Sequence, residues 1–128
     1  MDVITQPALL LLTMLLLKHL VCDFLVQPYW MISGKARYGH IGGIVHAGFH
    51  SLASWFLVYL FTQDIQFTSW IVAGEFIIHY HMDWIKVKVT NHYKWTASDQ
   101  MYWWMTGFDQ WIHQMTYVAM VIVTFHKH

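Results

Sequence analysis

Charged residues, cysteine and glutamate are all scarce in this sequence of 128 residues. Charged residues make up 11% of the chain, whereas they make up about 25% of an ordinary soluble domain. The seven basic and seven acidic side chains cancel, so no net charge attracts nucleic acid, and we expect no nucleic-acid partner. Cys22 is the single cysteine, which excludes an intrachain disulfide and argues against a thiolate zinc site.

The pattern of a cleavable signal peptide is also missing, so we expect none to be removed. The N-terminal residues MDVITQ contain no basic region, and no small-x-small cleavage site follows the first apolar run. We therefore expect this run to be retained as a structural element. Apolar residues are abundant instead, at 57% of the chain, and ten histidines face only seven acidic residues. So many histidines in so apolar a chain require an explanation.

Four apolar segments occupy most of the chain, at residues 7–27, 41–62, 68–88 and 101–125. Each has about 20 residues or more, the length that an α-helix needs to cross a bilayer. The connectors are short, and they are polar or contain glycine. The sequence therefore predicts an all-α fold in which residues 1–128 form a single domain, an integral membrane bundle of four transmembrane helices. The alternative is a soluble four-helix bundle with a very apolar surface.

Basic residues lie mainly in the first and third connectors. The first contains Lys35 and Arg37, the third is accompanied by three lysines, and the middle connector carries only Asp64. Because positively charged connectors stay in the cytoplasm, we expect both termini to lie outside it. The lipid bilayer is then the main partner of the chain, and the sequence leaves a homo-oligomer open.

Each apolar segment contains one pair of potential metal ligands, spaced four residues apart. The pairs are His19 with Asp23, His46 with His50, His79 with Asp83, and Asp109 with His113. Residues i and i+4 lie on one face of a helix, so the two side chains can share a metal ion or bind neighbouring ions. Ionisable side chains cost several kcal/mol at membrane depth, so each needs a partner or a function.

All eight of these residues fall in the cytoplasmic half of the predicted bundle. Eight ligands suit two divalent ions with about four protein groups each. Imidazole and carboxylate without thiolate favour zinc, manganese or iron over copper(I). The alternative is a set of buried histidines that only make hydrogen bonds to aspartates across the helices.

Candidate catalytic residues lie beside these ligands. Glu75 is one turn before His79 on the same face and could either support the ligands from behind or act as a general base; the ligand Asp83 is also a candidate base. Lys86 lies farther towards the cytoplasm, where it could meet an anionic substrate or simply extend to the membrane surface. Three more polar residues could position ligands or substrate: Lys18, Gln27 and Gln110.

The segments KHLVCDFLVQ, HAGFH, EFIIHYHMDWIK and DQWIH, together with Lys35, resemble the family called domain of unknown function 3307. This family consists of small membrane proteins of bacteria and their phages, and it is similar in style to membrane-bound metal-dependent hydrolases. The resemblance covers nearly the whole chain and implies a helical, metal-dependent protein of the bacterial inner membrane. The matching positions are His19, Asp23, Gln27, Lys35, His46, His50, His79, Asp83, Lys86, Asp109, Gln110 and His113.

The leading hypothesis is a membrane-embedded metal-dependent hydrolase. A metal pair lowers the pKa of water and can hold both oxygens of a phosphoester, so a phosphorylated or amphipathic substrate is favoured. A transporter or channel for divalent metal or protons is the first alternative, although ligands confined to one half of the bundle argue against it. A structural metal site in a protein that acts through a partner is the second. A soluble di-iron bundle is disfavoured because such sites use several glutamates and this chain has one, Glu75.

Overall fold

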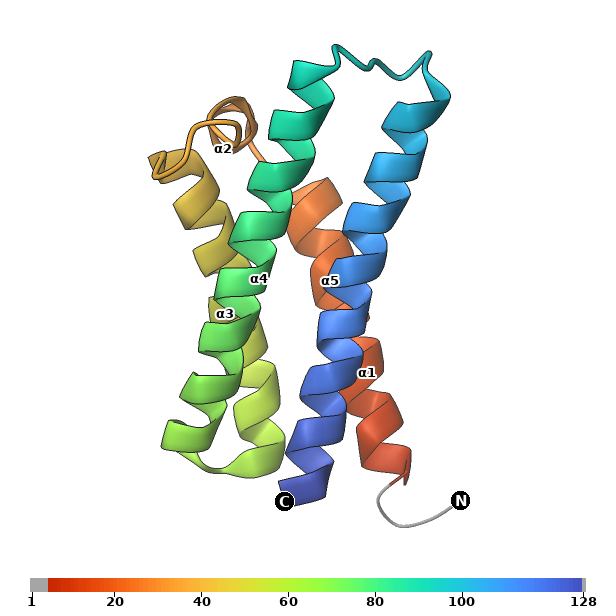
Figure 1. Cartoon of the computed structure of the whole chain (residues 1–128). Helices are drawn as coiled ribbons and strands as arrows, with labels where there is room; N and C mark the ends of the chain where they lie inside the picture. The colour runs from red at the N-terminus through yellow and green to blue at the C-terminus, as the bar shows by residue number, and fades with distance from the viewer. Residues whose placement is uncertain (1–4, 128) are drawn as a thin grey trace.

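The computed structural model describes residues 5–127, which form five α-helices and one π-helical turn (Figure 1). The elements are α1 (Thr5–Leu20), η1 (Val21–Leu25), α2 (Tyr29–Ser33), α3 (Ile41–Thr62), α4 (Ile65–His92) and α5 (Gln100–Lys127). The four long helices run alternately up and down in the order α1, α3, α4, α5 around the bundle, so that α1 and α4 are diagonal. The start of α1 and the end of α5 lie at one end of the bundle, which is called the end near the chain termini. The opposite end, with α2 and the α4–α5 connection, is called the α2 end.

The all-α prediction is confirmed, and three of the four predicted helices have different bounds in the structure. The predicted helix 41–62 coincides with α3. The predicted helix 7–27 ends earlier as an α-helix, because Val21–Leu25 adopt π-helical hydrogen bonding ahead of Pro28. The predicted helices 68–88 and 101–125 extend to Ile65–His92 and Gln100–Lys127. The first connector also contains α2, which begins directly after Pro28, a residue whose fixed φ suits a helix start.

The bundle buries its ionisable side chains and exposes its large apolar ones. Its buried polar residues include one lysine, five histidines and three carboxylates: Lys18, His19, His46, His50, Glu75, His79, Asp83, Asp109 and His113. Its exposed residues include large side chains on all four long helices, among them Leu17, Phe56, Leu60, Trp70, Ile77, Trp104 and Ile122. A soluble protein has the opposite arrangement, whereas a polar interior with an apolar surface matches a lipid environment.

Two of the helical segments are long and apolar enough to cross a membrane, Thr5–Leu25 and Ile41–Thr62. This criterion rests on length and composition alone. Of the described residues, those in α4 and α5 fall short of it. The ionisable residues of α4, such as Glu75, Asp83 and Lys86, lower the mean hydropathy of that helix. The same side chains line the interior of the bundle or its end, so they reduce the hydropathy of the helix without making its outer face polar.

The half of the bundle near the chain termini has an apolar core. Its buried members come from all four long helices: Leu11, Leu15, Val58, Val72, Tyr117, Met120 and Val121. The α3–α4 connection is short, because Gln63 ends α3 in the left-handed conformation and Asp64 accepts a hydrogen bond from the Phe67 amide at the start of α4. This half therefore holds the helices together, and the polar residues gather towards the α2 end.

The first turn of α3 packs directly against α2 through Gly42. A Cβ atom at Gly42 would lie 2.5 Å from the carbonyl oxygen of Trp30, which is backbone and cannot rotate away. We expect Gly42→Ala to lower the free energy of unfolding by about 1–3 kcal/mol, measured by thermal unfolding in detergent. Gly107→Ala is the matched control, because no atom lies within 4 Å of its added Cβ. Equal losses in the two variants would contradict the close approach.

Candidate metal centre

The carboxylate of Asp23 is surrounded by three histidines from α1 and α3. Its Oδ1 lies 2.8 Å from Nε2 of His50 and 3.1 Å from Nε2 of His46. Its Oδ2 lies 3.2 Å from Nε2 of His19. All three rings therefore direct the same nitrogen, the one that most often binds metal in such sites, towards one point in the bundle interior.

The carboxylate of Asp83 connects the histidines of α4 and α5 to the histidines around Asp23. Its Oδ2 lies 3.2 Å from Nε2 of His79 and 3.5 Å from Nε2 of His46. Its Oδ1 lies 3.2 Å from Nε2 of His113, which is also 3.1 Å from Oδ1 of Asp109. Four helices thus contribute to one continuous His–Asp cluster, and the structure brings all eight predicted ligands into it.

Two groups within this cluster could each hold a metal ion. The first is Asp23, His46, His50 and His79, and the second is His79, Asp83 and His113; in each group the ligand atoms all lie within 4.8 Å of one another. His79 belongs to both. The predicted ligands His19 and Asp109 lie outside these groups but contact them, through Asp23 and His113 respectively.

A purely hydrogen-bonded network does not account for all of these nitrogens. The Nε2 atoms of His46 and His79 are buried and make no hydrogen bond, although carboxylate oxygens lie 3.1 and 3.2 Å away. A buried polar atom without a partner carries a cost of about 1–3 kcal/mol. A cation between these nitrogens and the carboxylates would give both atoms a ligand bond, so the donor set fits a metal ion.

The π-helical turn η1 positions Asp23. Within it the amide of Val26 donates to the carbonyl of Val21 at 2.9 Å, five residues back, instead of following the α-helical pattern. π-turns inside helices are rare and occur frequently at functional sites. The i,i+4 pattern predicted that His19 and Asp23 face the same direction, but it gave no signal for this change of helix type.

A second layer of residues supports the histidines from the side nearer the chain termini. Nζ of Lys18 lies 2.8 Å from Oε1 of Glu75, 3.1 Å from the hydroxyl of Tyr117 and 3.2 Å from Nδ1 of His50. The Tyr117 hydroxyl in turn lies 2.9 Å from Nδ1 of His19. Partners on the second ring nitrogen fix the orientation of a ligand histidine, so Lys18 and Tyr117 orient two of them.

Sequence reasoning found Lys18 and Glu75 but missed Tyr117 and Ser54, whose hydroxyl donates to Glu75 at 3.0 Å. Tyr117 follows His113 by four residues and so continues the row Asp109, His113 on α5, a signal that could have revealed it. Glu75 was predicted either to support the ligands from behind or to act as a general base. It lies behind the histidines, paired with Lys18, and it is not part of the pocket described next.

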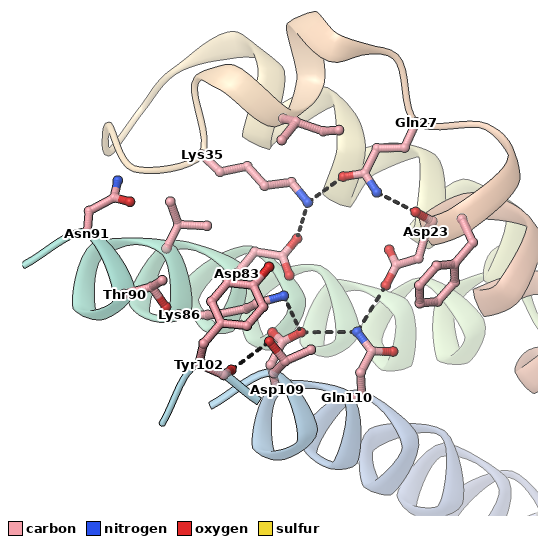
Figure 2. A pocket seen from close by; sticks show the side chains of 14 residues that line it. Asp23, Gln27, Lys35, Asp83, Lys86, Thr90, Asn91, Tyr102, Asp109 and Gln110 are labelled. Atoms are coloured by element: carbon pink, nitrogen blue, oxygen red, sulfur yellow. Dashed lines mark hydrogen bonds and ion pairs between the residues drawn. The ribbon is translucent and has the colours of Figure 1, made fainter. Parts of the chain in front are cut away.

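A pocket of about 360 Å³ adjoins the cluster on the side of the α2 end (Figure 2). Asp23, Asp83 and Asp109 line it. Each of these three carboxylates also lies within 3.2 Å of a histidine nitrogen of the cluster. Gln110 links two of them, donating to Asp109 at 3.1 Å and reaching Asp23 at 3.5 Å. The predicted residues Gln27 and Lys86 also line the pocket, as does Lys35, which the spacing of the helix residues had not indicated.

The family assignment agrees with this geometry. A family described as "Protein of unknown function (DUF3307)" matches residues 11–128, a range that contains all eight predicted ligands and every residue of the pocket. No curated protein and no solved structure matches the chain. The family match confirms the resemblance that the His and Asp motifs predicted, and the chain belongs to the DUF3307 family.

Proposed function

We propose that this protein is a membrane-embedded, metal-dependent hydrolase. Three features support it: a polar interior within an apolar exterior, a His–Asp cluster with unpartnered ligand nitrogens, and a pocket that reaches the same carboxylates. The observation that carries the proposal is the pair of buried Nε2 atoms of His46 and His79. These two atoms make no hydrogen bond. The aspartates next to them, Asp23 and Asp83, also line an accessible pocket.

We propose four membrane spans: the two segments that are long and apolar enough by composition, and the helices α4 and α5. The exposed apolar side chains of α4 and α5, such as Ile77, Ile78, Trp111 and Ile122, favour lipid around these helices as well. The start of α1 and the end of α5 lie at the same end of the bundle, as an even number of spans requires. With Lys35 and Arg37 at the α2 end, that end faces the cytoplasm of a bacterial inner membrane.

The two ligand groups suit two divalent ions that share His79. Neutral imidazole and carboxylate ligands favour zinc, manganese or iron. When bound, such ions lower the pKa of water and so supply a nucleophile near neutral pH. Asp83 touches the histidines and lines the pocket, so it is positioned to accept a proton from water there. Glu75 acts indirectly, through Lys18 and the rings that Lys18 orients.

The test uses the full chain, purified in detergent, stripped of metal and reloaded separately with zinc, manganese or iron. Hydrolysis of chromogenic carboxyl esters, phosphomonoesters and phosphodiesters is then followed. We expect activity only after reloading, and we expect Asp23→Asn to reduce it to the level of the stripped protein. The matched control is Asp99→Asn, because Asp99 lies in the α4–α5 connection and contacts only Thr96 through its side chain.

Three results would contradict the proposal. Failure of the chain to bind any of the three metals would leave the histidines as a hydrogen-bonded network. Tight metal binding without hydrolysis of any ester, combined with metal uptake into proteoliposomes, would identify a transporter instead. Tight binding with neither activity would favour a structural site in a protein that acts through a partner.

A further inference from the structure

We infer that the pocket beside the metal centre binds a phosphoryl group through Lys35 and Lys86, and that the substrate is an amphipathic phosphoester. This inference rests on the proposed function, because it assigns the substrate class of the same site. Its basis is the placement of two lysines above three carboxylates, the charge that metal ions would give this site, and the apolar rim of the pocket.

The two lysines come from different elements and meet over the pocket (Figure 2). Nζ of Lys35, from the segment after α2, lies 3.3 Å from Oδ2 of Asp83 and donates to Oε1 of Gln27 at 2.6 Å. Nζ of Lys86, from α4, lies 3.5 Å from Oδ2 of Asp109. Both ammonium groups are therefore held next to the carboxylates, and a lysine that only extended to the membrane surface would not make these contacts.

Metal binding reverses the charge of this site. The carboxylates of Asp23, Asp83 and Asp109 outnumber the two lysines by one negative charge. Histidines that bind metal do so as neutral imidazoles, so two divalent cations would leave an excess of about three positive charges at this site. Only an anion can offset such an excess, and a phosphoryl group has the charge and the acceptor oxygens for two ammonium groups and a metal pair.

The rim of the pocket adds an apolar requirement. Phe24 and Ile32 line the pocket and are 64% and 47% exposed. The neighbouring residues Leu25, Tyr29 and Trp30, from η1 and α2, are exposed too. These side chains lie at the α2 end, where the proposed orientation puts the cytoplasmic membrane surface. An apolar chain of the substrate can therefore stay in the lipid along η1 and α2 while its phosphoryl group enters the pocket.

The test measures phosphorus relaxation by NMR on manganese-loaded protein in a maltoside detergent, which contains no phosphorus. Manganese broadens the signal of a phosphoryl group only when the two lie close together. The probes are inorganic phosphate and dioctanoyl phosphatidic acid, with dioctanoylglycerol as an unlabelled competitor that lacks the phosphoryl group. Metal content is measured by elemental analysis in each sample before any probe is added, so loss of metal is distinguished from loss of the anion site.

We expect both phosphorus probes to broaden, with phosphatidic acid binding more tightly and dioctanoylglycerol competing poorly. Lys35→Met and Lys86→Met should each keep the metal and weaken phosphoryl binding about tenfold or more, since a charge-assisted hydrogen bond is lost. Lys88→Met is the matched control: it is two residues from Lys86 on α4, but its Nζ lies over the Trp84 ring and outside the pocket.

Three outcomes would overturn the inference. Metal-loaded protein that broadens neither probe has no phosphoryl site next to the metal. Lysine variants that bind phosphate as tightly as the parent protein exclude Lys35 and Lys86 as its ligands. Equal affinity for inorganic phosphate and phosphatidic acid would limit the site to a soluble phosphate and remove the amphipathic part. A parent protein that takes up no manganese, zinc or iron contradicts the proposed function itself, and the elemental analysis reports that separately.

Discussion

Alanine in place of His79 is expected to remove one metal ion and to weaken the binding of the other. His79 is the one residue shared by the two ligand groups, and its Nε2 is one of the two buried nitrogens without a hydrogen bond. Its removal leaves the second group with only Asp83 and His113, fewer than the three or four protein ligands that hold a zinc ion, and it leaves the first group with three. We therefore expect elemental analysis of purified His79→Ala to give one ion of zinc, manganese or iron per chain or less, against about two ions per chain in the parent protein.

Replacements within a single group should have a smaller effect. His50→Ala leaves the first group with three ligands and should only weaken the binding of its ion. His113→Ala leaves the second group with two ligands, so it should lose one ion and keep the other at full affinity. His81→Ala is the matched control on the same helix: its ring contacts Tyr38 and the Ile77 carbonyl, away from the cluster. Full metal content in His79→Ala would exclude the shared ligand, and equal loss in all of these variants would point to a single ion in place of two.

Much of the site could be predicted because its residues follow the helical repeat. His19 with Asp23, His79 with Asp83 and Asp109 with His113 are four residues apart, so each pair faces one direction whatever its helix packs against. In the structure each of these pairs lies within 3.2 Å. The alternation of four apolar segments likewise determined the number of long helices, since spans of this length have few other stable states.

The rest depends on contacts that the repeat does not encode. Lys35 reaches Asp83 only because the chain after α2 folds back over the end of the bundle, where Gly42 allows close packing. The π-helical turn at Asp23 depends on the chain leaving α1 before Pro28. Glu75 was predicted beside the ligands because it shares a face with His79. Its true partner, Lys18, lies on the diagonal helix, which spacing within one segment cannot reveal.

This diagonal pair leads to the second large effect, a stability loss in Lys18→Met. The side chains of Lys18 and Glu75 are only 5% and 1% exposed, and their charges are 2.8 Å apart. Removing Lys18 leaves the Glu75 carboxylate buried without a countercharge, and breaking a buried pair in this way costs about 3–5 kcal/mol. We expect a loss of this size in the unfolding free energy of the metal-free protein in detergent, where metal binding adds nothing to stability.

The double variant Lys18→Met/Glu75→Leu separates the structural role of Lys18 from its role in orienting ligands. With both charges gone, an apolar pair of similar volume should restore most of the lost stability, as replacement of buried ion pairs commonly does. The contact of Lys18 with Nδ1 of His50, at 3.2 Å, stays lost. Metal affinity should therefore remain about 10–100-fold weaker than in the parent protein, the usual effect of removing a group that orients a ligand. Full recovery of both stability and metal affinity would reduce Lys18 to charge compensation for Glu75. Recovery of stability alone would mean that α1 contributes to the metal centre through Lys18 as well as through its ligands.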